Sequence, residues 1–162
     1  MFRSIKLPNN ITGKIYLHSM PGNYEEYELA FSELSEKDIQ TVISLTSLDE
    51  IRMKAPDYAK AIEAGSLPFN RISFPIRDFS VPEDRDAYLC LVKETASNIK
   101  SGESMLIHCG AGIGRTGMFA ACVLLALGLK KPDALARVRS AGSEPEMPYR
   151  AALVDWVAEQ FN

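Results

Sequence analysis

The sequence has few of the residues that mark secreted, metal-binding or membrane proteins. Its 162 residues include three cysteines, two histidines and one tryptophan. So small and odd a set of cysteines forms no disulfide framework and favours a reducing compartment. His18 and His108 are too few to suggest a metal-ligand cluster, so we expect no metal and no cofactor. The longest apolar run, 118–129, is too short to span a bilayer.

Neither sign of charge is in large excess. The chain has 18 lysines and arginines against 21 aspartates and glutamates, which gives a net charge of −3. Because there is no strongly basic field, we expect no nucleic acid as a partner. The first ten residues are polar and do not fit a signal peptide. We therefore expect a cytoplasmic protein that does not associate with membranes.

Length and patterning indicate one α/β domain over residues 1–162. A hydrophobic content of 46% is ordinary for a globular protein of this size. We expect strands near 15–17, 41–45, 70–76 and 104–109, with the first at an edge of the sheet. We expect helices near 24–34, 47–64 with a break at Pro56, 83–100, 118–127, 132–140 and 148–161. This alternation predicts a mostly parallel sheet of four to five strands with helices on both faces.

The most informative stretch is 108–117, which reads HCGAGIGRTG. The segment before it predicts a buried strand, and the apolar segment after it predicts a helix. The glycine-rich turn between them places backbone N–H groups at a helix N-terminus, which is a favourable site for an anion. Arg115 adds a guanidinium fork that can bind two phosphoryl oxygens.

Cys109 lies on the rim of this predicted anion site. Backbone dipoles, the helix terminus and Arg115 all favour the thiolate form of a cysteine in that position. A thiolate that faces a bound phosphate is a nucleophile directed at phosphorus. The motif therefore predicts cleavage of phosphate esters through a cysteinyl-phosphate.

The order His-Cys, five residues, Arg-Thr resembles the signature of the cysteine-dependent protein tyrosine and dual-specificity phosphatases. The loop is similar to that of the tyrosine-specific branch. The chain from 15 to 161 is more similar to the compact dual-specificity branch, in particular to the cyclin-dependent-kinase-associated phosphatases. The resemblance implies that the substrates are phosphorylated proteins, with hydrolysis of phosphotyrosine. We also expect hydrolysis of phosphoserine and phosphothreonine, because the short chain has little room for segments that deepen the pocket, and a shallow pocket admits these shorter side chains.

The resemblance also implies roles for individual residues. His108 would orient Cys109 by hydrogen bonding without acting as acid or base. Thr116 would stabilise the thiolate as the cysteinyl-phosphate breaks down, although its hydroxyl could instead cap the following helix. The backbone that would cradle the phosphate comprises Gly110, Ala111, Gly112, Ile113 and Gly114.

The leaving oxygen needs a proton, and Asp78 is the predicted donor. It directly follows the strand expected at 70–76, so it should lie at the same edge of the sheet as Cys109. The resemblance agrees, because the family places its general acid about thirty residues before the cysteine. Asp78 could also be a solvated turn residue. Glu83 and Asp84 are rival carboxylates, more suited to the start of the next helix.

The segment 144–150 departs from the family pattern. Many relatives carry in this segment a glutamine that positions water. We align the position of that glutamine with Arg150, although a glutamine, Gln160, lies further along the chain. Arg150 could bind a second acidic group on the substrate or be a plain surface residue.

Two other functions remain as alternatives. A phosphatase for phosphoinositides, inositol phosphates or RNA 5′-phosphates usually has lysines inside the loop, where this chain has Gly110, Ala111 and Ile113. A non-catalytic phosphate-binding module usually lacks the cysteine, the arginine or the acid, and all three are present here.

Overall fold

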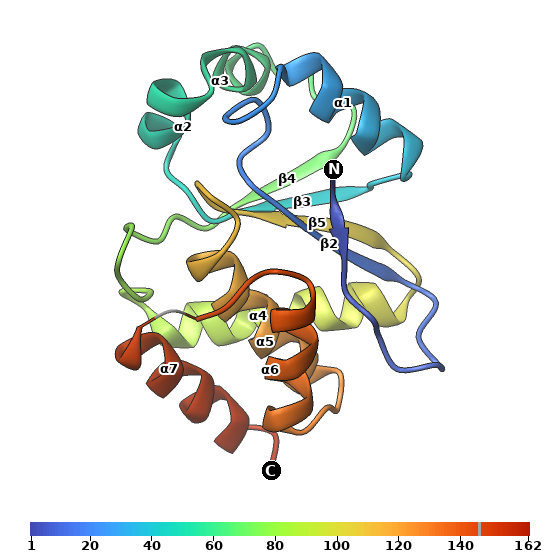
Figure 1. The fold of residues 1–162 in the computed structure, drawn as a ribbon, viewed down its shortest axis with the longest axis vertical. Coiled ribbons are helices and arrows are strands. Elements are labelled where there is room, and N and C mark those ends of the chain that lie inside the picture. Colours follow the sequence, from blue (N-terminus) through green and yellow to red (C-terminus); the bar gives the residue numbers. More distant parts are fainter. Residues whose placement is uncertain (146) are drawn as a thin grey trace.

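The fold is built on a five-stranded sheet (Figure 1). In the computed structural model, which describes residues 1–145 and 147–162, the strand order is β1-β2-β5-β3-β4. In chain order the strands are β1 (Arg3–Ser4), β2 (Lys14–His18), β3 (Thr41–Ser44), β4 (Asn70–Ser73) and β5 (Ser104–His108). The pairs β2–β5, β5–β3 and β3–β4 are parallel, and β1 is antiparallel to β2. The predicted mostly parallel α/β sheet is confirmed.

Helices cover both faces of the sheet (Figure 1). One face carries α1 (Tyr27–Glu36), α2 (Leu48–Lys54) and α3 (Pro56–Glu63). The other carries α4 (Arg85–Lys100), α5 (Gly114–Ala126), α6 (Lys131–Ser140) and α7 (Pro148–Glu159). Within the described ranges, no helix is long and apolar enough to cross a membrane.

The core is thickest around β5 and α5. Met105, Leu106 and Ile107 are fully buried, as expected for a central parallel strand with both faces covered. α5 is buried along nearly its whole length because α4, α6 and α7 pack around it. Cys109 therefore lies between a buried central strand and the most buried helix.

Three differences from the sequence-based predictions have a clear physical reason. β2 is not an edge strand, because Arg3 and Ser4 pair with its outer side, and a two-residue strand has no periodicity to reveal it. β4 ends at Ser73, before Pro75, which cannot donate a ladder hydrogen bond. α5 begins at Gly114, so the motif itself forms its first turn.

Candidate active site

Residues 109–114 form a loop between the carboxyl end of β5 and the start of α5. This is the edge of a parallel sheet where ligands usually bind. Cys109 is buried, with 3% of its surface exposed, and its Sγ accepts a hydrogen bond from the N–H of Gly112 at 3.3 Å. Gly112 has a φ of +76°, and a Cβ there would lie 2.4 Å from the carbonyl oxygen of His18, so glycine is required.

In the first half of the loop, hydrogen bonds hold the carbonyl groups outward. The Cys109 carbonyl accepts from His108 Nδ1 at 3.0 Å. The Gly110 carbonyl accepts from the N–H of Met20 at 3.0 Å and from Asn23 Nδ2 at 3.2 Å. In a trans peptide the N–H points opposite to the carbonyl, so the N–H groups of Gly110 and Ala111 face the concave side of the loop.

The second half of the loop is fixed in the same way. The Gly112 carbonyl accepts from Arg3 Nη2 and from Ser143 Oγ, both at 2.6 Å. The Ile113 carbonyl accepts from the N–H of Glu144 at 3.1 Å. These bonds turn the N–H groups of the next residues, Ile113 and Gly114, toward the concave side. The result is a ring of donors suited to a tetrahedral anion.

His108 is neutral and structural in this arrangement. Burial lowers the pKa of His108 to about 4, although its bond to the Cys109 carbonyl opposes that shift. Because a carbonyl only accepts, Nδ1 carries the proton. Nε2 then accepts from the hydroxyl of Tyr58 at 3.0 Å. With both ring nitrogens occupied, His108 orients the Cys109 peptide and has no site free for proton transfer.

The guanidinium of Arg115 is oriented by protein acceptors on one side. Its Nη1 donates to Glu50 Oε2 and to the Ile76 carbonyl, each at 2.9 Å, and its Nη2 donates to Glu50 Oε1 at 2.8 Å. Three of the five N–H donors are thereby used. The remaining donors, on Nε and Nη2, lie along the other edge of the fork, which matches two oxygens of a phosphoryl group.

Glu50 is a site residue that the sequence analysis missed. The spacing of Ser47 and Glu50 predicts a capping box, and the Glu50 N–H does bond to Ser47 Oγ at 3.1 Å. The Glu50 side chain, however, turns to Arg115 and Lys54. Burial alone would raise the pKa of Glu50, but hydrogen bonds from Arg115 and Lys54 and their positive charges lower it to about 2. The carboxylate therefore stays ionised at neutral pH.

Replacing Glu50 by glutamine should loosen Arg115. We expect kcat/KM to fall about 10- to 100-fold, because a small misplacement of a positioning group can cost that much. The Glu50–Arg115 pair should also stabilise the fold at pH values above 4.5, the ordinary pKa of a glutamate carboxyl group. This stabilisation should be lost as the pH falls toward 2, the lowered pKa of Glu50. Urea unfolding of both proteins from pH 7 to pH 2 measures this.

A matched control is Glu63→Gln, which removes an exposed carboxylate that pairs with Arg52 on the surface. It should leave kcat/KM unchanged. Glu50→Gln with normal kinetics, or with a stability loss that does not shrink on acidification, would contradict the role given to Glu50.

Asp78 lies beside Arg115, as the sequence predicts. Its Oδ1 is 3.5 Å from Arg115 Nη2 and accepts from the N–H of Phe79 at 3.0 Å. The Asp78 side chain is 48% exposed, so its carboxyl group is open to a ligand. We call residues 77–82 the acid loop.

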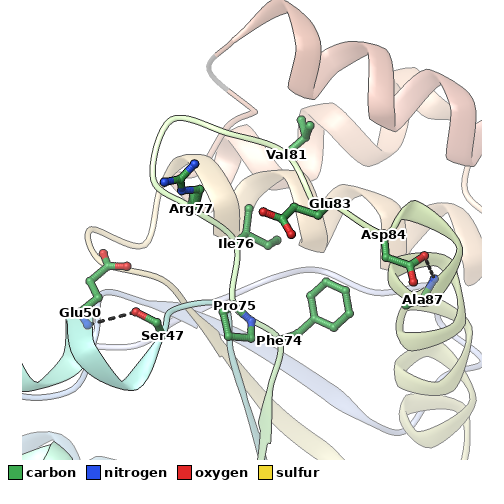
Figure 2. A pocket seen from close by; sticks show the side chains of 10 residues that line it. All are labelled: Ser47, Glu50, Phe74, Pro75, Ile76, Arg77, Val81, Glu83, Asp84 and Ala87. Atoms are coloured by element: carbon green, nitrogen blue, oxygen red, sulfur yellow. Dashed lines mark hydrogen bonds between the residues drawn. The ribbon is translucent and has the colours of Figure 1, made fainter.

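The rival carboxylates line a cavity of about 650 Å³ (Figure 2), which Glu50 and Ile76 also border. Asp84 caps α4, because its Oδ1 accepts from the N–H of Ala87 at 3.0 Å. Glu83 lines this cavity together with Val81 and Ile76. Neither carboxylate pairs with Arg115 in the part of the chain described.

Two expectations at the helix starts are corrected. Thr116 does not cap α5, because Ile113 occupies the N-cap position, and among the described residues Thr116 Oγ1 is buried without a hydrogen-bond partner. Arg150 is not a surface arginine. It is 2% exposed, and its Nε donates to the Ser80 carbonyl at 2.9 Å.

Other supporting residues were also missed. Arg3, Asn23, Tyr58 and Ser143 each bond to the loop or to His108 from distant parts of the chain. No local pattern marks them, since each is an ordinary polar residue. Only the placement of the segments 3–4, 20–23 and 141–144 around residues 109–114 identifies them.

Comparison with known proteins shows the family. A protein-family model named PTP-SAK matches residues 13–155. It describes the DSP-PTPase phosphatase domain of the Swiss Army Knife proteins. The chain therefore belongs to this family of dual-specificity and tyrosine phosphatase domains. The resemblance seen in the sequence is confirmed.

Individual relatives include one partial sequence match and solved structures of the same fold. A protein of Invertebrate iridescent virus 3 named "Putative tyrosine phosphatase 067L" is 34% identical over 58 residues, which cover 34% of this chain and 24% of that protein. Kinase-associated phosphatase, solved with its catalytic cysteine replaced by serine, has a TM-score of 0.83 at 18% identity and covers 99% of this chain and 95% of its own. P. aeruginosa TpbA in complex with pTyr has a TM-score of 0.62 at 20% identity, covering 98% and 95%.

Proposed function

We propose that residues 1–162 act as one catalytic domain that hydrolyses phosphotyrosine and also phosphoserine and phosphothreonine in proteins. Cys109 is the nucleophile, and Arg115 binds the phosphoryl group and stabilises the transition state. Asp78 is the acid and then the base. One observation carries the proposal: Cys109, the free edge of the Arg115 guanidinium and the open Asp78 carboxyl group lie around one donor ring.

The reaction has two balanced steps. In the first, the Cys109 thiolate attacks phosphorus, the P–O bond to the substrate breaks, and Asp78 gives its proton to the leaving oxygen. In the second, the Asp78 carboxylate takes a proton from water as that water attacks the cysteinyl-phosphate. The S–P bond breaks, inorganic phosphate leaves, and the thiolate is restored. The backbone N–H groups of 110–114 and Arg115 bind the phosphoryl oxygens in both steps.

Thr116 and His108 have supporting roles in this proposal. The buried Thr116 hydroxyl has no other partner among the described residues, so it is free to donate to the thiolate as the S–P bond breaks. His108 keeps the Cys109 peptide in place. The three free cysteines also support a reducing compartment, and we propose a cytoplasmic enzyme.

We expect the protein to turn over para-nitrophenyl phosphate and both phosphotyrosine and phosphothreonine peptides. The chain is short, and 48% of the Asp78 side chain is exposed, which fits a shallow pocket. Release of inorganic phosphate from matched peptides measures this. No activity on any ester would disprove the enzyme assignment, and strict phosphotyrosine selectivity would disprove dual specificity.

A parallel panel of inositol phosphates, phosphoinositides and a 5′-phosphorylated RNA tests the alternative substrates. The absence of lysine from residues 109–115 predicts slower turnover of these polyanions than of phosphopeptides. A reversed order would reject the protein-phosphatase assignment while keeping the chemistry.

A further inference from the structure

The first turn of α7 holds the acid loop at two adjacent points. Arg150 Nε donates to the carbonyl of Ser80 at 2.9 Å, and the Tyr149 hydroxyl donates to the carbonyl of Phe79. Phe79 and Ser80 directly follow Asp78. A helix some 70 residues away in sequence therefore fixes the backbone on which the proposed acid stands.

Arg150 occupies an unusual environment for this contact. It is 2% exposed, and its Nη2 is buried with no hydrogen-bond partner among the residues described. Burial and the nearby Arg115 guanidinium lower the pKa of Arg150, whereas Asp78, Tyr149 and Cys109 favour its charged form. A buried cation next to another cation costs stability. Among the described residues, the one hydrogen bond of the Arg150 side chain goes to the acid loop.

The acid loop is a tight turn with one backbone hydrogen bond among its described residues, from the N–H of Ser80 to the carbonyl of Arg77 at 3.1 Å. Phe79 has a φ of +59°, a region that an aromatic residue rarely adopts, and its side chain is 68% exposed and adds little packing. The cavity in Figure 2 borders the loop at Arg77 and Val81. The contacts from α7 add restraint at Phe79 and Ser80, where the backbone is least favourable.

We propose that Arg150 is a positioning residue for proton transfer. Through Ser80, and together with Tyr149, it keeps the acid loop beside Arg115 so that Asp78 reaches the leaving oxygen. Because its Nη2 is buried, Arg150 acts through the loop and does not bind the substrate anion. This inference rests on the proposed function, in which Asp78 is the general acid.

The test compares wild type with Arg150→Met, Arg150→Lys and Tyr149→Phe on aryl phosphates whose phenols differ in acidity. Poor leaving groups need the Asp78 proton most, so Arg150→Met should slow them about 10- to 100-fold and slow the best leaving groups far less. The decline of kcat/KM at high pH, which follows loss of the acid's proton, should weaken. Arg150→Lys should recover part of the rate, because its ammonium group can still donate to a carbonyl.

Inhibition by inorganic phosphate separates this role from direct binding. The inhibition constant should stay within about threefold of wild type, a difference of about 0.7 kcal/mol. Weaker phosphate inhibition, with an equal rate loss for every leaving group, would overturn the proposal and place Arg150 on the substrate. Unchanged kinetics in Arg150→Met would overturn it as well.

A structural control comes from the same helix. Leu153→Ala removes a buried side chain of α7 that bonds to nothing in the acid loop. Leu153→Ala should lower Tm without changing the leaving-group dependence. If Leu153→Ala and Arg150→Met changed the leaving-group dependence equally, the proposal would be overturned. If Arg150→Met does not fold, Tyr149→Phe tests the same restraint at an exposed residue. An unchanged leaving-group dependence in Tyr149→Phe would then reject the proposal. A wild-type protein inactive on all esters would instead disprove the proposed function.

Discussion

Replacing Cys109 by serine is expected to abolish phosphate ester hydrolysis while leaving phosphopeptide binding intact. The donor ring and Arg115 remain, so the phosphoryl group still finds its partners. A serine hydroxyl needs a general base, and His108 cannot act as one because Tyr58 and the Cys109 carbonyl occupy both ring nitrogens. Phosphate release and calorimetric binding of a phosphotyrosine peptide measure the two properties separately.

The control for this change is Cys90→Ser, because Cys90 is exposed on α4, outside the loop at residues 109–114. It should keep wild-type activity. Turnover in Cys109→Ser would reject the cysteinyl-phosphate mechanism, and loss of peptide binding would show that the loop had not kept its shape.

Replacing Asp78 by alanine should produce the second largest loss. A positioned acid contributes about 10²–10⁴-fold to proton transfer, so hydrolysis of phosphopeptides should slow by that factor. Asp78 Oδ1 is engaged by Phe79 and lies near Arg115, which leaves Oδ2 for the leaving oxygen. An aryl phosphate with a strongly acidic phenol should lose much less in phosphoenzyme formation, and the high-pH decline of kcat/KM should disappear. Pre-steady-state release of the phenol across a pH series measures both.

Glu83→Ala and Asp84→Ala are the internal controls, since both residues are close to Asp78 in the chain. Asp84→Ala should cost helix stability of about 1 kcal/mol through loss of the cap, without changing the pH profile. If either control loses the high-pH decline while Asp78→Ala keeps it, the wrong carboxylate has been chosen.

The central part of the fold could be predicted because its signals are local. An apolar run, a glycine-rich turn and a second apolar run specify β5, the loop and α5 within about twenty-five residues. Asp78 was predictable as a candidate because it comes five residues after the end of β4 at Ser73, and parallel strands bring their carboxyl ends to one edge.

The supporting residues could not be predicted, for a different physical reason. Glu50 satisfied a local capping pattern, so nothing in the sequence pointed to its long-range bond with Arg115. Arginine is rarely buried, so Arg150 was expected either at the surface or on the substrate. Arg3 acts through a strand of two residues. Each depends on contacts across the finished fold, which single-sequence patterns do not encode.

The four outward carbonyl groups of the loop at residues 109–114 have a consequence for the folding of the chain. Their partners include Arg3, Met20 and Ser143, which lie up to 109 positions away from the carbonyl they hold. Such contacts form only once β1, β2 and the segment before α7 have closed around β5. The donor ring is thus absent from a newly made or partly unfolded chain. The phosphoryl site that we propose around Cys109 would therefore be complete only at the end of folding.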